Sequence, residues 1–111
     1  MWRWRDSTGS PTLDEAGMAQ LIYTPHFDRA YVRFTRRNPV RRSCVDRTLA
    51  RLEHNPDDPR LKTHMLTGER LGLFACSCGY DCRIIFDWLP GSKTRTETIH
   101  LLNVGTHDEV Y

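Results

Sequence analysis

The sequence predicts an α+β domain in which an antiparallel sheet is packed by a helical hairpin, with the element order β-α-α-β-β-β. Three observations support this fold class. Two helix-start signals, Thr24-Pro25 and Asn38-Pro39, follow one another closely. Beyond the turn-rich run 55–59, the spacing of apolar residues changes from that of a helix to that of a strand. The 111 residues are enough for one domain with one modest core.

An N-terminal extension precedes the predicted domain. Residues 7–11 (Ser-Thr-Gly-Ser-Pro) have the composition of a linker, and no apolar period begins before Met18. Residues 18–23 (Met-Ala-Gln-Leu-Ile-Tyr) are typical of a start that runs directly into a strand. We therefore expect residues 1–17 to be flexible or non-native and dispensable, and the domain to span residues 18–111.

Two amphipathic helices are predicted to follow this strand. Thr24 can cap the first helix, and Pro25 at the first helical position gives up no hydrogen bond. The second helix starts at Asn38-Pro39 and is expected to end near residues 54–56, so a short turn joins an antiparallel pair. The apolar face of the first helix is formed by Phe27, Ala30, Tyr31 and Phe34. The inner stripe of the second is formed by Val40, Cys44, Val45, Thr48, Leu49 and Leu52.

The remainder of the chain is predicted to be a meander of strands. The candidate strands are residues 71–78, 82–88 and 97–104. The second has the strongest strand pattern, because Ile84, Phe86 and Trp88 alternate. A tight turn over residues 79–81 and a hairpin loop over residues 90–93 connect the three strands. A short C-terminal turn or helix is expected after the last strand.

The formal net charge is only +2, but it is unevenly distributed. Between Arg29 and Arg51 the chain has eight arginines and one acid, Asp46, so this segment carries +7 and the remainder −5. Such segregation produces a field to which polyanions respond, and a solvated helical face explains the same pattern. Arginine in place of lysine favours phosphate, because guanidinium binds phosphate bidentately.

What the sequence lacks disfavours several classes of protein. No apolar run approaches the ~18 residues of a membrane helix, and residues 1–5 lack the apolar core of a secretory signal. We therefore expect a cytoplasmic protein whose four cysteines are reduced thiols rather than disulfides. The chain has no glycine-rich phosphate loop, Gly-x-Ser-x-Gly elbow, paired carboxylates or His-Glu-x-x-His motif. These absences argue against nucleotide-binding enzymes, serine hydrolases and zincins.

Three of the four cysteines, Cys76, Cys78 and Cys82, fall within seven residues, and the fourth is Cys44. This crowding is compatible with a zinc site, a redox sensor or thiols buried in the core. The spacing lacks the paired knuckles of structural zinc sites, whereas cysteine is a common small core residue. We therefore favour core thiols and expect neither a metal nor another cofactor.

Two histidines, His64 and His107, are the main candidates for catalysis, because histidine is the usual general acid or base near neutral pH. Metal-free RNA cleavage needs a base for the 2′-hydroxyl, cations for the phosphorane-like transition state and an acid for the leaving 5′-oxygen. Lys62 and Arg83 supply cations, and Tyr111 can hold a base by stacking. Plainer interpretations are a surface charge for Arg83 and a hydrophobic plug for Tyr111. The other histidines, interpreted as surface or packing residues, are His26, His54 and His100.

Three motifs carry a family resemblance through their order and spacing. They are residues 61–64 (Leu-Lys-Thr-His), 79–86 (Gly-Tyr-Asp-Cys-Arg-Ile-Ile-Phe) and 105–111 (Gly-Thr-His-Asp-Glu-Val-Tyr). They resemble motifs of the RelE/ParE toxin superfamily, and most of all its YafQ-like branch of mRNA interferases. Over residues 18–111 the resemblance implies the RelE-like fold. It also implies the toxin of a type II toxin–antitoxin module, an endoribonuclease that cleaves mRNA in the ribosomal A site and is blocked by a cognate antitoxin.

The resemblance implies roles for individual residues. His64 matches the family's loop histidine and His107 its C-terminal histidine, and we assign His64 as base and His107 as acid. Arg83 lies where RelE-like members place a phosphate-binding arginine, and Asp81 matches an acidic residue of the YafQ-like branch. The residues expected to bind RNA are the loop lysine, the terminal aromatic residue and arginines of the helical hairpin, namely Lys62, Tyr111, Arg33, Arg36, Arg37 and Arg41.

The sequence departs from the family on one strand. RelE itself has lysines on the strand that here reads Phe74-Ala75-Cys76, and YafQ-like members carry a histidine near the place of Ser77. Two alternatives stay open beside the RNase. One is a ParE-like gyrase poison, a branch that lacks the histidine pair, and the other is a non-catalytic RNA- or ribosome-binding protein. The expected antitoxin has an acidic, partly disordered segment that covers the basic hairpin and the cleft.

Overall fold

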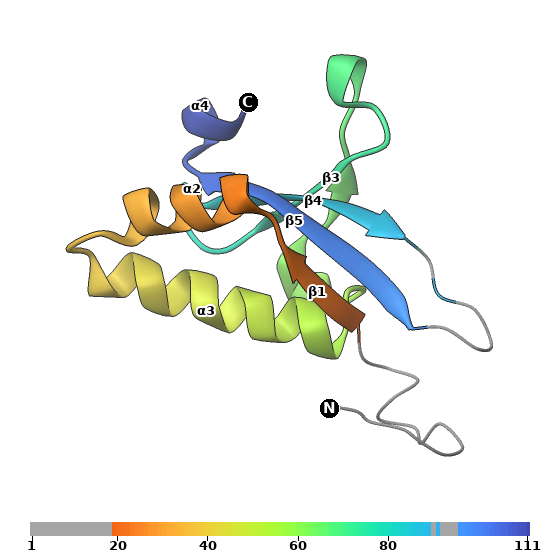
Figure 1. The fold of residues 1–111 in the computed structure, drawn as a ribbon, viewed down its shortest axis with the longest axis horizontal. Helices are drawn as coiled ribbons and strands as arrows, with labels where there is room; N and C mark the ends of the chain where they lie inside the picture. The colour runs from red at the N-terminus through yellow and green to blue at the C-terminus, as the bar shows by residue number, and fades with distance from the viewer. Residues whose placement is uncertain (1–18, 90, 92–95) are drawn as a thin grey trace.

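The computed structural model describes residues 19–89, 91 and 96–111, which form a five-stranded sheet with a helical hairpin on one face and a short helix on the other (Figure 1). The spatial order of the strands is β1-β5-β4-β3-β2. The strands are β1 (Ala19–Tyr23), β2 (His64–Met65), β3 (Phe74–Ser77), β4 (Arg83–Leu89) and β5 (Glu97–Gly105). The helices are α2 (Pro25–Thr35), α3 (Pro39–His54) and α4 (His107–Val110), and the 3-10 turns are η1 (Pro59–Leu61) and η2 (Gly68–Arg70).

Both predicted helix starts are confirmed by their caps. The Thr24 hydroxyl accepts a hydrogen bond from the Phe27 backbone N–H at 3.2 Å, and the Asn38 side chain accepts one from the Arg41 N–H at 3.1 Å. The prediction that Val40 belongs to the inner stripe of α3 is wrong, because this side chain is 72% exposed. Val40 precedes the buried Val45 by five residues, which places it about 140° around the helix from that face.

The α+β class is confirmed, but one strand pair differs from the predicted antiparallel arrangement. Strands β2 to β5 pair antiparallel in order, whereas β1 pairs parallel with β5, with Ala19 opposite Glu97 and Tyr23 opposite Leu101. Parallel pairing needs a long crossover, and here the helical hairpin and three strands separate the two partners in the chain. β5 therefore lies between the first strand and the rest of the sheet.

The predicted strand over residues 71–78 is wrong in its first half. The strand begins at Phe74, and the preceding residues 71–72 are exposed, with Gly72 at φ +98°. The sequence also gave no signal for β2, where His64 pairs with Ala75 and Met65 pairs with Phe74. A two-residue strand is too short to show a period-2 pattern, so it could not be predicted from alternation.

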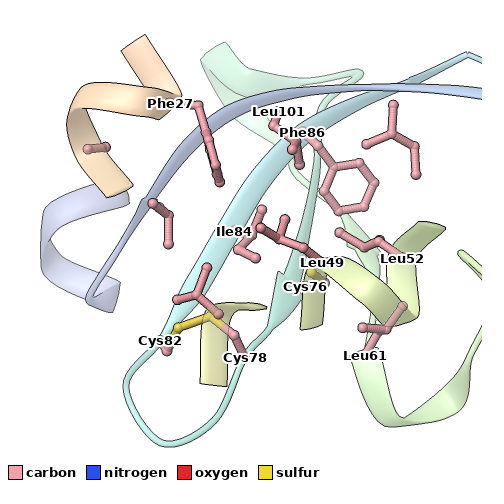
Figure 2. Packing of buried hydrophobic residues seen from close by; sticks show 14 of the residues in the cluster. Phe27, Leu49, Leu52, Leu61, Cys76, Cys78, Cys82, Ile84, Phe86 and Leu101 are labelled. Atoms are coloured by element: carbon pink, nitrogen blue, oxygen red, sulfur yellow. A yellow bond between two sulfur atoms is a disulfide. The ribbon is translucent and has the colours of Figure 1, made fainter. Parts of the chain in front are cut away.

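The sheet buries apolar side chains on both faces. The larger cluster lies between the sheet and the helical hairpin and includes Phe27, Leu52 and Phe86 (Figure 2). The smaller cluster, on the opposite face, is formed by Leu66, Ala75, Ile85 and Val110 with the partly buried Leu73. Because successive side chains of a strand point to opposite faces, adjacent residues Ile84 and Ile85 of β4 join different clusters.

The expectation of four reduced thiols is wrong for two of them. Cys78 and Cys82 form a disulfide whose Cα atoms are 5.0 Å apart (Figure 2). The tight turn predicted over residues 79–81 is the physical reason: it reverses the chain between the two cysteines, and the Cys78 backbone N–H donates to the Cys82 carbonyl at 3.0 Å. The thiols of Cys44 and Cys76 are free, and Cys76 lies fully buried in the larger cluster, as expected of a core thiol.

Two expectations concern segments outside the described residues: the extension over residues 1–17 and the hairpin loop over residues 90–93, of which Gly91 alone is described. Within the described ranges, no helix combines the length and apolar character that a membrane crossing requires.

The two free thiols should react very differently. Burial raises the pKa of the Cys76 thiol to about 12, so at pH 8 it stays protonated as well as inaccessible. Iodoacetamide should therefore label Cys44, which is half-buried, and spare Cys76 in the native protein, as read by peptide mass spectrometry. In guanidinium chloride both should react, and equal labelling of the native thiols would contradict the burial of Cys76.

Candidate active site

Four of the predicted site residues come together where β4 and β5 meet α4. The His107 backbone N–H donates a hydrogen bond to Asp81 Oδ1 at 3.1 Å. The rings of His107 and Tyr111 pack edge to face with their centroids 4.6 Å apart. Arg83, the first residue of β4, pairs with Gly105 at the end of β5, two residues before His107. Two of the three sequence motifs, residues 79–86 and 105–111, thus meet at one end of the sheet.

Helix α4 holds His107 and Tyr111 over the face of the sheet opposite the hairpin. The Thr106 hydroxyl accepts from the Glu109 N–H at 3.2 Å, and the Glu109 carboxylate accepts from the Thr106 N–H at 2.8 Å, which forms a capping box. The turn is so tight that a Cβ at Gly105 would lie 2.8 Å from Glu109 Oε1 and 3.1 Å from Glu109 Cβ. Arg70 of η2 donates to the Val110 carbonyl and ties the β2–β3 connection to this helix.

The loop that presents Asp81 is held in an uncommon conformation. Asp81 has φ +52°, in the left-handed region that aspartate tolerates better than most residues. Arg83 Nη1 donates to the Cys82 carbonyl at 2.9 Å and lies 3.5 Å from the Gly79 carbonyl, so the guanidinium braces both sides of the turn. Because these bonds leave other N–H groups of Arg83 available, the side chain can also contact a phosphate.

His64 belongs to β2, an edge strand of the sheet, and Lys62 precedes it by two residues. The pairing of His64 with Ala75, and of Ala75 with Ile85, assigns His64 to the same face of the sheet as Ile85 and Arg83. The His64 ring is exposed, and its Nδ1 lies 3.1 Å from the Lys62 carbonyl. Lys62 has φ +53°. Among the described residues neither side chain hydrogen-bonds to Asp81 or His107, so any joint action requires a substrate that spans the face.

A basic cleft of about 560 Å³ connects Lys62 to Asp81 and Arg83. It runs between α3 and the turn over residues 79–81, and we call it the basic cleft below. Asp81 is the one acid among its lining residues, and the cations lining it are Arg47, Arg51, Arg60, Lys62 and Arg83. A cleft that is lined by positive side chains on several sides concentrates anions.

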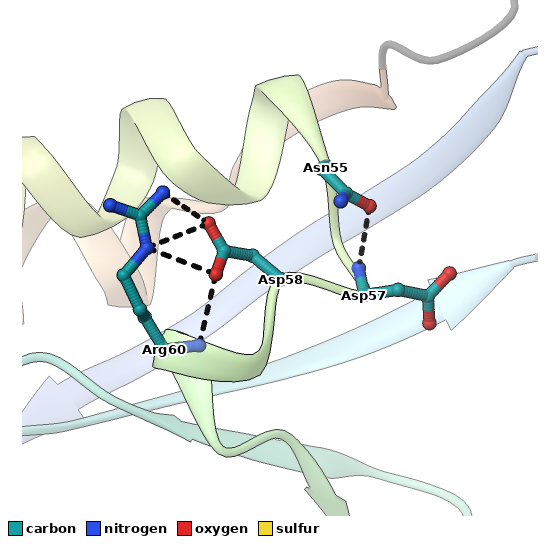
Figure 3. A network of polar contacts seen from close by, with 4 residues as sticks. All are labelled: Asn55, Asp57, Asp58 and Arg60. Carbon is teal, nitrogen blue, oxygen red and sulfur yellow. Dashed lines mark hydrogen bonds and ion pairs between the residues drawn. The ribbon is translucent and has the colours of Figure 1, made fainter.

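Arg47, Arg51 and Arg60 were missed as site residues from the sequence. The signal was present for two of them, because Arg47 and Arg51 are four residues apart and share one face of α3. Arg60 is held by Asp58, whose carboxylate accepts from the Arg60 side chain at 2.7 Å and from its backbone N–H at 2.9 Å (Figure 3). These bonds lower the pKa of Asp58 to about 2, so the pair persists at all but strongly acidic pH.

The arginines expected to bind RNA lie elsewhere. Arg33 and Arg36 line a shallow groove with Asp28, and Arg37 lines another near the α2–α3 turn. Arg41 has a structural contact: its guanidinium lies 4.3 Å from the centre of the Phe34 ring, and Nη1 donates to the Phe34 carbonyl at 3.3 Å. None of these arginines lines the basic cleft.

In the described part of the chain, no three His, Cys, Asp or Glu side chains are placed to hold an ion.

The architecture is the one seen in solved toxins of toxin–antitoxin systems, among them YafQ, a YoeB/ParE toxin and the toxin of the RelBE2 complex. No protein-family model matches the sequence, and no curated protein matches it. The three solved structures described next are 15% to 21% identical to this chain, so the likeness establishes the fold alone.

Three solved structures illustrate the similarity. YafQ from E. coli strain BL21(DE3) matches with a TM-score of 0.66 at 15% identity, over 84% of this chain and 98% of YafQ. A copper-bound mutant toxin from Helicobacter pylori matches with a TM-score of 0.62 at 21% identity, over 85% of this chain and 100% of that toxin. The RelBE2 toxin–antitoxin complex from Mycobacterium tuberculosis contains a chain that matches with a TM-score of 0.62 at 18% identity. The match covers 85% of this chain and 97% of the matched chain of the complex.

The cap of α4 should control the order of the site. Replacing Thr106 with alanine removes the hydroxyl that caps the Glu109 N–H, at a cost of about 1 kcal/mol to the local helix. We expect Thr106→Ala to speed amide hydrogen exchange at residues 109–111, measured by NMR, while the global free energy of unfolding changes little. Thr106→Ser keeps the hydroxyl and serves as the control. Equal exchange in both variants would show that the capping box does not hold α4.

Proposed function

We propose that this chain is the toxin of a type II toxin–antitoxin module, a ribosome-dependent endoribonuclease that cleaves mRNA by metal-free acid–base catalysis. The proposal rests on one observation above all: Asp81, Arg83, His107 and Tyr111, from separate motifs, meet at one end of a sheet face to which register also assigns His64. The sequence resemblance to YafQ-like mRNA interferases and the shared fold point to the same activity.

In this proposal each residue has a defined task. His64 takes the proton from the 2′-hydroxyl, and His107 gives one to the leaving 5′-oxygen. Arg83 and the cations of the basic cleft stabilise the charge that builds on the phosphate. Asp81 acts on His107 through its backbone N–H and thereby sets the position of the ring, so it is a positioning residue. Attack by the 2′-hydroxyl leaves a 2′,3′-cyclic phosphate on the upstream product.

The separation of His64 from the other candidate residues suits an RNA substrate that the ribosome, and not the protein alone, holds in position. The two histidines share a sheet face without a hydrogen-bonded path between them, so the RNA itself must bridge the base and the acid. The ribosome presents mRNA in a fixed conformation in its A site, and such alignment can supply a large part of the catalysis. Isolated protein should therefore cleave free RNA poorly.

A cognate antitoxin is the proposed protein partner, and the cytoplasm, where translated mRNA is found, is the proposed location. The RelBE2 structure is a toxin–antitoxin complex with this fold. The charge of this chain suits an acidic partner segment, because the run from Arg29 to Arg51 carries a formal +7. An antitoxin that also fills the basic cleft would exclude RNA from it.

A non-catalytic RNA- or ribosome-binding protein is the second candidate, and the basic cleft is the observation that favours it. Five cations around about 560 Å³ can hold phosphates whether or not any bond is cleaved. The ParE-like gyrase poison has weaker support, because that branch lacks the histidine pair that this chain retains.

The two histidines should decide between an RNase and a binder. Induction of the wild-type protein in a bacterial host should arrest growth and create new mRNA 5′ ends within translated codons. His64→Ala/His107→Ala should remove both effects, since the base and the acid are lost. His26→Ala/His54→Ala alters two other exposed histidines, which lie in the helices, and should retain both effects. Arrest without new 5′ ends, unchanged in the site variant, would favour the gyrase poison or the binder.

The basic cleft should supply the phosphate contacts. The probe is a single-stranded oligoribonucleotide with methylated 2′-hydroxyls, which cannot be cleaved. For each phosphate contact, its binding constant should fall by about 0.7 logarithmic units per tenfold increase in salt concentration. Arg47→Ala/Arg51→Ala should weaken binding and flatten this salt dependence in fluorescence anisotropy. Arg33→Ala/Arg36→Ala removes two arginines outside the cleft and should change the slope less. The reverse ranking would move the RNA-binding surface to the tip of the hairpin.

A further inference from the structure

The disulfide closes the loop that carries the positioning carboxylate. Cys78 and Cys82 bracket residues 79–81, and Asp81 within that loop accepts the hydrogen bond from the His107 N–H. Asp81 sits at φ +52°, a conformation that a free loop would populate less. A cross-link over so short a segment restricts the conformations open to Asp81, so its presence or absence bears directly on the site.

The two cysteines of the disulfide differ in their position relative to the basic cleft. Cys78 lines the cleft, whereas Cys82 does not, and each residue is 4% exposed overall. The free thiol of Cys44 lines the same cleft and lies against the loop, with its Sγ 3.7 Å from where a Cβ at Gly79 would be.

The charge around that approach selects the reagent. Arg47, Arg51 and Arg83 line the cleft that leads to Cys78. A small thiol or disulfide that carries carboxylates is attracted into such a cleft, and one that carries an amine alone is repelled. Glutathione has two carboxylates and one ammonium group, so it is a net anion at neutral pH, and cysteamine is a cation.

We propose that Cys78 and Cys82 form a reversible redox site, at which a small anionic thiol or disulfide enters the basic cleft, exchanges with Cys78, and sets whether Asp81 is held against His107. The consequence for RNA cleavage rests on the function proposed above. In a reducing compartment the disulfide opens and the loop relaxes, and an oxidising shift closes it and orders the site.

The exchange is balanced in atoms and electrons. The thiolate of the small molecule attacks Cys78 Sγ, a mixed disulfide forms, and Cys82 leaves as a thiolate that takes a proton from water. A second small thiolate attacks the sulfur of the first, so Cys78 is released as a thiol and a small-molecule disulfide departs. Two external thiols together lose two electrons, and the protein disulfide gains them. A small-molecule disulfide oxidises the two protein thiols by the reverse reaction.

Single-cysteine variants test the point of attack. In Cys82→Ser, glutathione disulfide should form a stable mixed disulfide on Cys78, detected as a mass increase in the intact protein and mapped by peptides. In Cys78→Ser, the remaining Cys82 should react at least roughly tenfold more slowly, because it does not line the cleft. Cys44→Ser is the matched control, since it removes a thiol of the same cleft and should leave the Cys78–Cys82 exchange intact. Equal rates at Cys78 and Cys82 would overturn the proposed entry route.

The wild-type chain tests the electrostatic selection without any substitution. Reduction of the disulfide, followed by quenching with iodoacetamide and mass spectrometry, should proceed faster with glutathione than with cysteamine after each rate is normalised to the thiolate concentration. Added salt should narrow the difference, because it screens the cleft. Normalised rates that are equal, or faster for cysteamine, would overturn the role of the basic cleft.

Hydrogen exchange and cleavage then separate this inference from the proposed function. Reduction should speed exchange of the His107 amide and leave the core amides of β4 unchanged. Cleavage of ribosome-bound mRNA in a purified translation system should fall roughly tenfold in the reduced protein. If neither form cleaves mRNA, the proposed function fails, while the exchange of the His107 amide still reports on the redox site. If both forms cleave equally and the His107 amide is unaffected, the redox coupling is wrong and the RNase proposal stands.

Discussion

The burial of both faces of β4 is the constraint on which the rest of the structure depends. Ile84 and Phe86 require the cover of the helical hairpin, and Ile85 between them requires cover on the opposite face. That second cover is small, and Val110 of α4 supplies part of it. Because α4 must fold back onto the sheet to bury Val110, His107 and Tyr111 are carried to the end of β4 where Asp81 and Arg83 lie. The candidate site is thus assembled by a packing requirement of the core.

The polar part of the site follows a different logic, since its groups are exposed or half-buried and little holds them except short local contacts. Asp81 and Lys62 are both in the left-handed region, and Arg60 is held by the ion pair with Asp58. Residues in such conformations collect at functional sites because the surrounding structure bears their cost. The basic cleft therefore combines a rigid wall, α3, with a rim whose geometry depends on a few hydrogen bonds and on the Cys78–Cys82 link.

Features with a period or a cap could be predicted from the sequence, and features made by the meeting of distant segments could not. Thr24 and Asn38 cap the helices that follow them and are recognisable from neighbouring residues alone, and the alternation of apolar residues around Phe86 indicates β4. By contrast, the two-residue strand β2 has no period, the parallel partner of β1 lies beyond residue 96, and the disulfide depended on an assumption about the compartment rather than on the turn that joins its cysteines. Asp81, Arg83, His107 and Tyr111 were predicted as residues of one site and lie together, whereas His64, predicted with them, shares no hydrogen bond with Asp81 or His107 among the described residues. The cleft arginines Arg47, Arg51 and Arg60 emerge only when α3 is placed against the turn.

The position of β5 between β1 and β4 has a consequence for the order of events during synthesis. β1 is made first but has no strand to pair with until residues 97–101 have been added, because its only partner in the described sheet is β5. Contacts between such distant segments form late and slowly. The nascent chain consequently carries an unpaired first strand and no assembled site through most of its translation. If the chain has the proposed activity, that activity can begin only once the sheet is complete.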